Sequence, residues 1–231
     1  MKDTNLQHCM DVAKMLLYQE PRILKMYIVS HPIIQCFMYP AEDYKSSGKC
    51  LFVNNEDDLR QIRANISKMI DSSDNYRHLF QMISNPYKAT FFKLTEEYLS
   101  DKDFSQSLAS AWMLSEFPNG DTNVSIADFV RFFKRANKDF LMTKSEICRI
   151  NHLPDIVTVY RGLQRNSKLK GMSWTLDLEV AKWFANRFGH NGLVYQAMVQ
   201  KKDILAYFDG RNEKEIIVDP KRLSEITLVN K

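Results

Sequence analysis

Two short segments in the C-terminal third of the chain combine residue types that suit contact with an anionic ligand. In Tyr160-Arg161-Gly162, the guanidinium offers a planar fork of donors that matches phosphate oxygens, and the glycine lets a ligand approach the backbone closely. In Ser173-Trp174-Thr175, two hydroxyls would lie on one face of an extended segment, because residues two apart point the same way. Both segments are therefore candidates for ligand contact.

A third segment, Glu213-Lys214-Glu215, carries two carboxylates just before the apolar run Ile216-Ile217-Val218. If the strand has begun by Glu213, both carboxylates share one face and Lys214 points away from it. Two negative charges so close together suit the stabilisation of a developing positive charge, or the orientation of a cationic acceptor.

The order of these segments is more informative than any one of them. Alone, they read as a surface arginine before a turn, a helix cap at Thr175 and a charged strand edge that deters aggregation. Together, an arginine on a first strand, a hydroxyl pair before a helix and Glu-x-Glu opening a later strand resemble the R-S-E class of mono-ADP-ribosyltransferases, which includes arginine-specific bacterial toxins and related phage enzymes. The similarity spans roughly Val157 to Pro220. The family's middle motif is usually Ser-Thr-Ser, and here it is Ser-Trp-Thr, with Trp174 packing in the core or lining the pocket.

The resemblance implies an activity and a pair of catalytic carboxylates. NAD would be a substrate whose nicotinamide–ribose bond breaks with oxocarbenium character, and ADP-ribose would pass to a protein side chain. By the same resemblance, Glu215 is the catalytic residue, which hydrogen-bonds the nicotinamide ribose and stabilises the growing positive charge. Glu213 orients the acceptor and helps to take its proton. A glutamate at this first position resembles the arginine-modifying members, so arginine is the expected acceptor.

The resemblance also assigns contacts with NAD. Arg161 would hold NAD through phosphate or ribose oxygens, and Gly162 would meet the nicotinamide carboxamide through its backbone. Ser173 would brace the catalytic glutamate and the NAD ribose, while Thr175 would support the local shape. Phe184 is a further candidate for contact with NAD, although core packing is the simpler interpretation of its place on the next helix.

Residues 207–212 occupy the position of the family's acceptor-recognising turn. Asp209-Gly210 favours a turn there. Tyr207 or Phe208 would stack on the acceptor or on nicotinamide, with core packing in a strand as the alternative.

The elements that would position these segments follow a change of pattern after Pro154. Residues 156–161 are rich in β-branched side chains and predict a strand. Further strands are predicted at residues 193–200, 204–208, 215–218 and 226–229. One helix interrupts them, beginning near Thr175 or Asp177 and ending at Gly189. Its apolar residues recur at a spacing of four: Leu176, Val180, Phe184 and Phe188. Trp183, on the same helix, is also expected in the core.

The first 150 residues have mainly helical patterns. Residues 56–70 give one apolar face, made of Leu59, Ile62, Ile66 and Ile70. Ser125, with Asp128 three residues on, predicts the start of another helix. The predicted fold class is therefore α+β, in one compact body. A mainly helical N-terminal region, 1–150, would brace the cleft or recognise the target, and a β-rich, ADP-ribosyltransferase-like split-sheet core that binds NAD, 151–231, would follow it. Residues 115–119 and the helix capped by Ser125 are candidates for a lobe over the cleft.

The composition is typical of a globular protein, with 45% hydrophobic and 26% charged residues among 231. We find no apolar run of about 18 residues that would predict a membrane span, and no apolar core of a signal peptide at the N-terminus. The four cysteines are scattered, which favours reduced thiols, and the histidines lack a metal-ligand spacing, so no metal is expected. We expect a cytoplasmic protein without membrane contact, acting in the host cytoplasm if a phage encodes it.

The net charge is +4, and the whole excess lies in the last 81 residues, which hold 13 Lys and Arg against 9 Asp and Glu. This excess of positive charge suits an anionic ligand. It is also compatible with transfer of ADP-ribose to a nucleic acid, although the sequence has no dense basic run and no motif that reads nucleic acid. Hydrolysis of NAD with water as acceptor is another alternative on the same fold. A catalytically inactive binding module is the alternative from a different class. For a toxin or phage effector, control by an antitoxin or a host factor also stays open.

Overall fold

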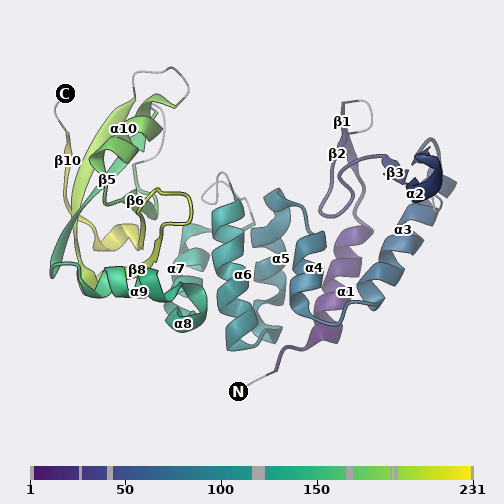
Figure 1. Cartoon of the computed structure of the whole chain (residues 1–231), viewed down its shortest axis with the longest axis horizontal. Helices are drawn as coiled ribbons and strands as arrows, with labels where there is room; N and C mark the ends of the chain where they lie inside the picture. The colour runs from purple at the N-terminus through teal and green to yellow at the C-terminus, as the bar shows by residue number, and fades with distance from the viewer. Residues whose placement is uncertain are drawn as a thin grey trace. The chain divides into compact units, whose positions relative to one another are not determined.

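The structure is a computed structural model (Figure 1), and the residues it describes are 3–25, 28–40, 44–115, 123–164, 169–187, 189 and 192–229. They divide into unit 1, Met1–Asp121, and unit 2, Thr122–Lys231. The helices just before the sheet therefore belong to the same unit as the sheet, whereas the sequence pattern grouped them with the N-terminal helices in 1–150. Of the proposed lobe, residues 116–119 lie outside the described residues.

Unit 1 is built mainly from helices. They are α1 (Leu6–Leu17), α2 (Tyr44–Ser47), α3 (Glu56–Asp71), α4 (Tyr76–Met82), α5 (Lys88–Thr95) and α6 (Asp101–Leu114), with short 3-10 turns η1 (Asn85–Tyr87) and η2 (Glu96–Tyr98). Two antiparallel strand pairs accompany them, β1 (Arg22–Lys25) with β2 (Ile28–Ser30) and β3 (Met38–Pro40) with β4 (Cys50–Phe52). None of the helices in the described ranges has the length and apolar character needed to span a bilayer.

Helix α3 confirms the face predicted for residues 56–70. The buried apolar residues on it are Leu59, Ile62, Ile66 and Ile70. Burial of a continuous apolar stripe is the main stabilising contribution to such a helix. Asn55 caps its N-terminus, since its side chain accepts a hydrogen bond from the backbone N–H of Asp58 at 2.9 Å.

Unit 1 contains a buried lysine, Lys88, at the start of α5. Its side chain is 4% exposed, and its ammonium donates to the carbonyl of Phe80 at 2.6 Å and lies 4.6 Å from the centre of that ring. Burial lowers the pKa of Lys88 from 10.5 to about 8, because removal from water disfavours the charged form.

The shift at Lys88 predicts how stability changes with pH. The unfolded chain binds more protons than the folded one between pH 8 and 10.5, so the stability contributed at this position rises with pH across that window and is lost as pH falls through 8. Relative to Lys88→Met, wild type should gain roughly 2 to 3 kcal/mol between pH 7.5 and pH 10 in urea denaturation. The exposed Lys102→Met is the control and should show no such trend. A constant difference between wild type and Lys88→Met would contradict the prediction.

Unit 2 combines a sheet with four described helices, and its mixed helix and strand content agrees with the predicted α+β class. The helices are α7 (Ile126–Arg135), α8 (Lys138–Leu141), α9 (Lys144–Asn151) and α10 (Leu178–Asn186). The strands are β5 (Ile156–Leu163), β6 (Ser173–Thr175), β7 (Leu193–Gln200), β8 (Ile204–Phe208), β9 (Glu215–Val218) and β10 (Ser224–Leu228), with 3-10 turns η4 (Lys201–Asp203) and η5 (Pro220–Arg222). All five predicted strands are present. Segment 173–175, treated in the sequence only as extended, is the sixth.

The strand order brings the three motif segments together. The sheet is antiparallel with the order β10-β7-β5-β6-β9-β8, so the strand with Arg161, the strand with Ser173 and the strand with Glu215 are immediate neighbours. In the register, Thr175 pairs with Tyr160 on one side and with Glu215 on the other. Residues far apart in the sequence are therefore placed side by side by the sheet itself.

Helix α10 packs on β5 through small residues, which corrects the predicted core face. Its buried residues are Ala181 and Ala185, whereas Val180 and Phe184 are only half-buried. A Cβ at Gly162 would overlap the carbonyl oxygen of Ala181 and lie 2.7 Å from the amide nitrogen of Ala185, so helix and strand backbones nearly touch there. Such an approach leaves no room for large side chains.

Two residues of the same helix complete the correction. Trp183 is 56% exposed, so the expectation that it lies in the core is wrong. The side of α10 that packs on β5 carries the small residues Ala181 and Ala185, and Trp183 is not among the buried residues of the helix. Phe188, the last residue of the predicted face, lies outside the described residues. Gly189 has φ +70°, which suits its predicted place after the helix.

Capping boxes start two of the other helices. In α7, the side chain of Ser125 accepts from the N–H of Asp128, whose carboxylate accepts from the N–H of Ser125, which confirms the predicted start. In α9, Thr143 and Glu146 form the same arrangement. Phe133 of α7 lies 6.4 Å, ring centre to ring centre, from Phe208 of β8, so α7 packs against the far strand of the sheet.

Candidate active site

A serine–glutamate hydrogen bond lies at the centre of the candidate site. Ser173 Oγ donates to Glu215 Oε1 at 2.5 Å, from β6 to the adjacent strand β9. The Glu215 side chain is only 6% exposed, so this carboxylate is held in one orientation in a poorly hydrated environment. Charge-assisted bonds of this kind are shorter and stronger than neutral ones. The structure thus brings together two residues predicted from separate motifs.

Arg161 reaches the same place from β5. Its Nη1 donates to the backbone carbonyl of Ser173, and its guanidinium lies against Gly171, where a Cβ would be 2.6 Å from Cζ. Burial lowers the pKa of Arg161 to about 10, and the nearby charge of Glu215 acts in the opposite direction. Its Nε is buried and has no hydrogen-bond partner within the part of the chain that the structure describes. A buried donor without a partner is costly, so it favours a polar ligand or ordered water at this point.

The second hydroxyl of the middle motif has a structural role. Thr175 Oγ1 donates to the backbone carbonyl of Glu213 at 2.7 Å and accepts from the N–H of Asp177 at 3.0 Å. It therefore ties β6 to the segment that carries the glutamates, as expected for a residue that supports local shape. Trp174 between the two hydroxyl residues is 2% exposed, and its indole N–H donates to the carbonyl of Gly171 at 3.0 Å, so it packs in the core.

The two glutamates are not related by strand alternation. Strand β9 begins only at Glu215. Lys214 has φ +45°, a left-handed backbone conformation that residues other than glycine rarely adopt. The condition for a shared face, a strand that has begun by Glu213, is therefore not met. Lys214 is held by an ion pair to Asp177, 2.7 Å from Nζ to Oδ2. The hydrogen bond from Lys214 is the main reason that the pKa of Asp177 is lowered.

An aspartate organises the turn before the glutamates. Asp209 accepts from the backbone N–H of Lys214 at 3.1 Å and from the hydroxyl of Tyr207 at 3.0 Å, while its own N–H donates to Glu146 Oε1 at 3.0 Å. Burial first, and then the bond to Asp209, raise the pKa of Tyr207 to about 12. Tyr207 and Phe208 are 3% and 4% exposed, so they pack in the core rather than present a stacking surface.

Glu213, in contrast to Glu215, is accessible. Its side chain is 22% exposed, and Oε2 lies 2.8 Å from Nη2 of Arg211. The two carboxylates therefore have different environments. Glu215 is buried against a serine hydroxyl, and Glu213 faces outward and already holds a guanidinium.

Two predicted NAD contacts have other neighbours. The close packing of α10 on β5 is enough to require glycine at position 162, with or without a contact to NAD. Phe184 is half-buried and lies edge-on to Trp183, 4.9 Å between ring centres, outside the group of hydrogen-bonded residues around Glu215. Trp183 also lines a shallow surface pocket of about 410 Å³ on α10. The other lining residues are Glu179, Lys182, Asn186 and Arg187.

Sequence reasoning did not identify Glu146 or Gly171. It assigned Asp177 only to the start of a helix, where Asp177 does cap α10, and Asp209 only to a turn. The Thr-x-x-Glu spacing of the α9 cap was the one readable signal for Glu146. Among the described residues, no group of three or more His, Cys, Asp or Glu side chains is placed to hold a metal ion.

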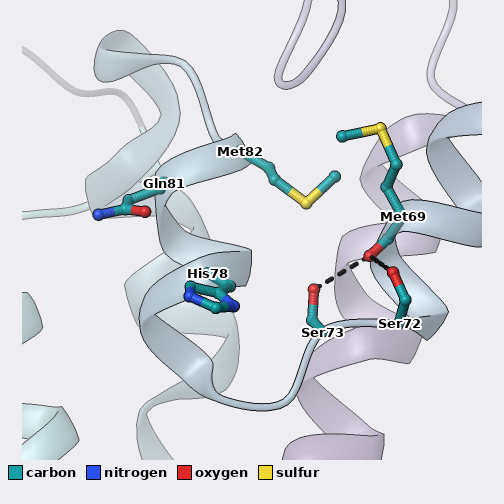
Figure 2. Close-up of a pocket in the computed structure, with 6 residues that line it drawn as sticks. All are labelled: Met69, Ser72, Ser73, His78, Gln81 and Met82. Atoms are coloured by element: carbon teal, nitrogen blue, oxygen red, sulfur yellow. Dashed lines mark hydrogen bonds between the residues drawn. The ribbon is translucent and has the colours of Figure 1, made fainter.

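Unit 1 has a pocket of about 370 Å³ between α3 and α4 (Figure 2). Its lining residues are Met69, Ser72, Ser73, His78, Gln81 and Met82. Both serine hydroxyls donate to the carbonyl of Met69, at 3.0 and 3.1 Å, and His78 pairs with Asp74 at 2.8 Å. These polar groups are satisfied by their own neighbours, so the pocket lacks an arrangement like that around Glu215.

Comparison with models of known protein families, with curated proteins and with solved structures gives no match.

Proposed function

We propose that unit 2 is a mono-ADP-ribosyltransferase that cleaves NAD and transfers ADP-ribose to an arginine side chain of a protein. The observation that carries the proposal is the contact of Arg161, Ser173 and Glu215 across three adjacent strands. The arginine, the serine and the glutamate each lie on a strand, and their order along the chain is the one on which the family resemblance rests. Charged side chains are seldom buried this far, and a carboxylate at 6% exposure within reach of an arginine's charge is a feature enriched at functional sites.

Glu215 would stabilise the positive charge that develops on the nicotinamide ribose. Its carboxylate is fixed by Ser173 before the substrate binds, so little reorganisation is needed when the charge develops. In this surrounding of low polarity the interaction is worth more than in water. The Glu215 carboxylate would accept a hydrogen bond from a ribose hydroxyl.

Arg161 would attract the pyrophosphate and brace the site. Its bond to the Ser173 carbonyl fixes the strand that holds the hydroxyl. Its buried Nε, with no partner among the described residues, leaves a donor for an anionic oxygen of NAD, directly or through water.

Glu213 would orient the acceptor guanidinium, since it is partly exposed and already engages one. Water is the second candidate acceptor, because the carboxylate is paired with Arg211 and an incoming arginine has to replace that partner. In that case the enzyme would hydrolyse NAD.

The test uses NAD labelled in its adenosine half, with agmatine as a small guanidine acceptor. Wild type should release nicotinamide and form labelled agmatine. Labelled products without agmatine adducts would favour hydrolysis, and absence of nicotinamide release would overturn the proposal.

Glu213→Gln is expected to separate transfer from cleavage. Loss of the negative charge should lower transfer to agmatine by roughly 100-fold, because the guanidinium is neither held nor deprotonated. Nicotinamide release into water should change little, since Glu215 and Ser173 are untouched. Glu179→Gln, an exposed glutamate paired with Lys182 on α10, is the matched control and should affect neither reaction. Equal loss of both reactions would contradict this role for Glu213.

A further inference from the structure

The turn that carries Glu213 also carries an arginine whose guanidinium lies against that carboxylate. Arg211 Nη2 is 2.8 Å from Glu213 Oε2, and the arginine side chain is 49% exposed. The guanidinium is thus accessible and lies against the group that would orient an acceptor.

Backbone geometry builds this pairing into the turn. Asn212 has φ +57° and its N–H donates to the carbonyl of Asp209 at 2.9 Å, and Lys214 follows with φ +45°. Asparagine adopts such an angle readily, whereas a lysine keeps it only where its surroundings stabilise it. Here the Asp209 carboxylate and the ion pair from Lys214 to Asp177 do so. The turn therefore keeps Arg211 next to Glu213.

We propose that Arg211 is an internal acceptor, so that the enzyme transfers ADP-ribose to its own Arg211 within one molecule. This rests on the proposed function above, in which Glu213 orients an acceptor guanidinium. A guanidinium nitrogen of Arg211 forms a bond to C1′ of the nicotinamide ribose. The bond from C1′ to nicotinamide breaks, and its electron pair leaves with nicotinamide. The proton lost by the guanidinium passes to Glu213 and then to water, so no oxidant or reductant takes part.

The experiment incubates the purified full-length chain with NAD and locates added ADP-ribose by peptide mass spectrometry. Wild type should carry one ADP-ribose on the peptide that contains Arg211, and Arg211→Lys should lose it. Arg222→Lys is the matched control, because Arg222 is another exposed arginine of unit 2 near an acid, 3.9 Å from Asp203. That variant should be modified like wild type. The rate per molecule should not change when the protein is diluted.

The outcomes separate this proposal from the proposed function. Formation of ADP-ribosyl agmatine with Arg211 unmodified would overturn the internal acceptor and leave the transferase intact. Modification of Arg211 at a rate that rises with protein concentration would overturn transfer within one molecule. Failure of wild type to release nicotinamide would overturn the proposed function and this proposal with it.

Discussion

Replacing Glu215 with glutamine should lower the rate of NAD cleavage by roughly 10²- to 10³-fold, the effect typical of removing one preorganised electrostatic contact from a transition state. The amide oxygen of glutamine still accepts a hydrogen bond from Ser173, so the packing of β6 against β9 is retained. What is lost is the negative charge opposite the ribose as it becomes cationic. The measurement is the initial rate of nicotinamide release at saturating NAD, with circular dichroism to confirm folding.

The matched control is Glu225→Gln, which neutralises an exposed glutamate on β10 of the same unit. It should cleave NAD at the wild-type rate. Glu215→Gln with wild-type turnover would remove Glu215 from the mechanism. A folded wild type without any NAD turnover would instead favour the alternative of a binding module built on this sheet.

Gly162→Ala should destabilise unit 2 by about 2 to 3 kcal/mol, at the upper end of the range for overpacking. The added methyl would overlap the carbonyl oxygen of Ala181 and lie 2.7 Å from the nitrogen of Ala185. Both are backbone atoms, so they cannot rotate away, and α10 has to shift from β5. Urea denaturation should show the loss of stability, and hydrogen exchange should be faster in β5 and α10 than elsewhere.

Gly210→Ala is the control for that experiment. Nothing lies within 4 Å of a Cβ at Gly210, and its φ is not in the left-handed region, so the same methyl should be tolerated. If Gly162→Ala kept wild-type stability but weakened NAD turnover, the packing explanation would fail. The backbone contact with nicotinamide expected from the family resemblance would then be favoured.

The strands and the order of the site residues could be predicted because both are local properties of the sequence. Strands β7, β8 and β9 were predicted at their observed bounds, and the β-branched run at residues 156–161 lies within β5. The three-residue strand β6 has no such run, and only its pairing with β5 and β9 defines it. The contact of Ser173 with Glu215 depends on that pairing, so the sequence indicated the participants but not the hydrogen bond.

The wrong expectations arose where tertiary contacts override local pattern. Spacing of large apolar residues selected the Phe184 side of α10, but the near contact at Gly162 requires the Ala181 and Ala185 side to face the sheet. Alternation would give both glutamates one face only if the strand had begun by Glu213, but β9 begins at Glu215. Lys214, with its positive φ, contacts Asp177 through its ammonium and Asp209 through its backbone N–H. No residue preference signals a left-handed lysine.

Strand β6 pairs with β5 in the register at a single position, Tyr160 with Thr175, whereas β5 and β7 pair along their whole length. The sheet thus has a seam, with β5, β7 and β10 on one side and β6, β9 and β8 on the other. The bond from Arg161 to the Ser173 carbonyl crosses this seam. A ligand that contacts both Arg161 and Glu215 would therefore add a second link between the two halves across this seam.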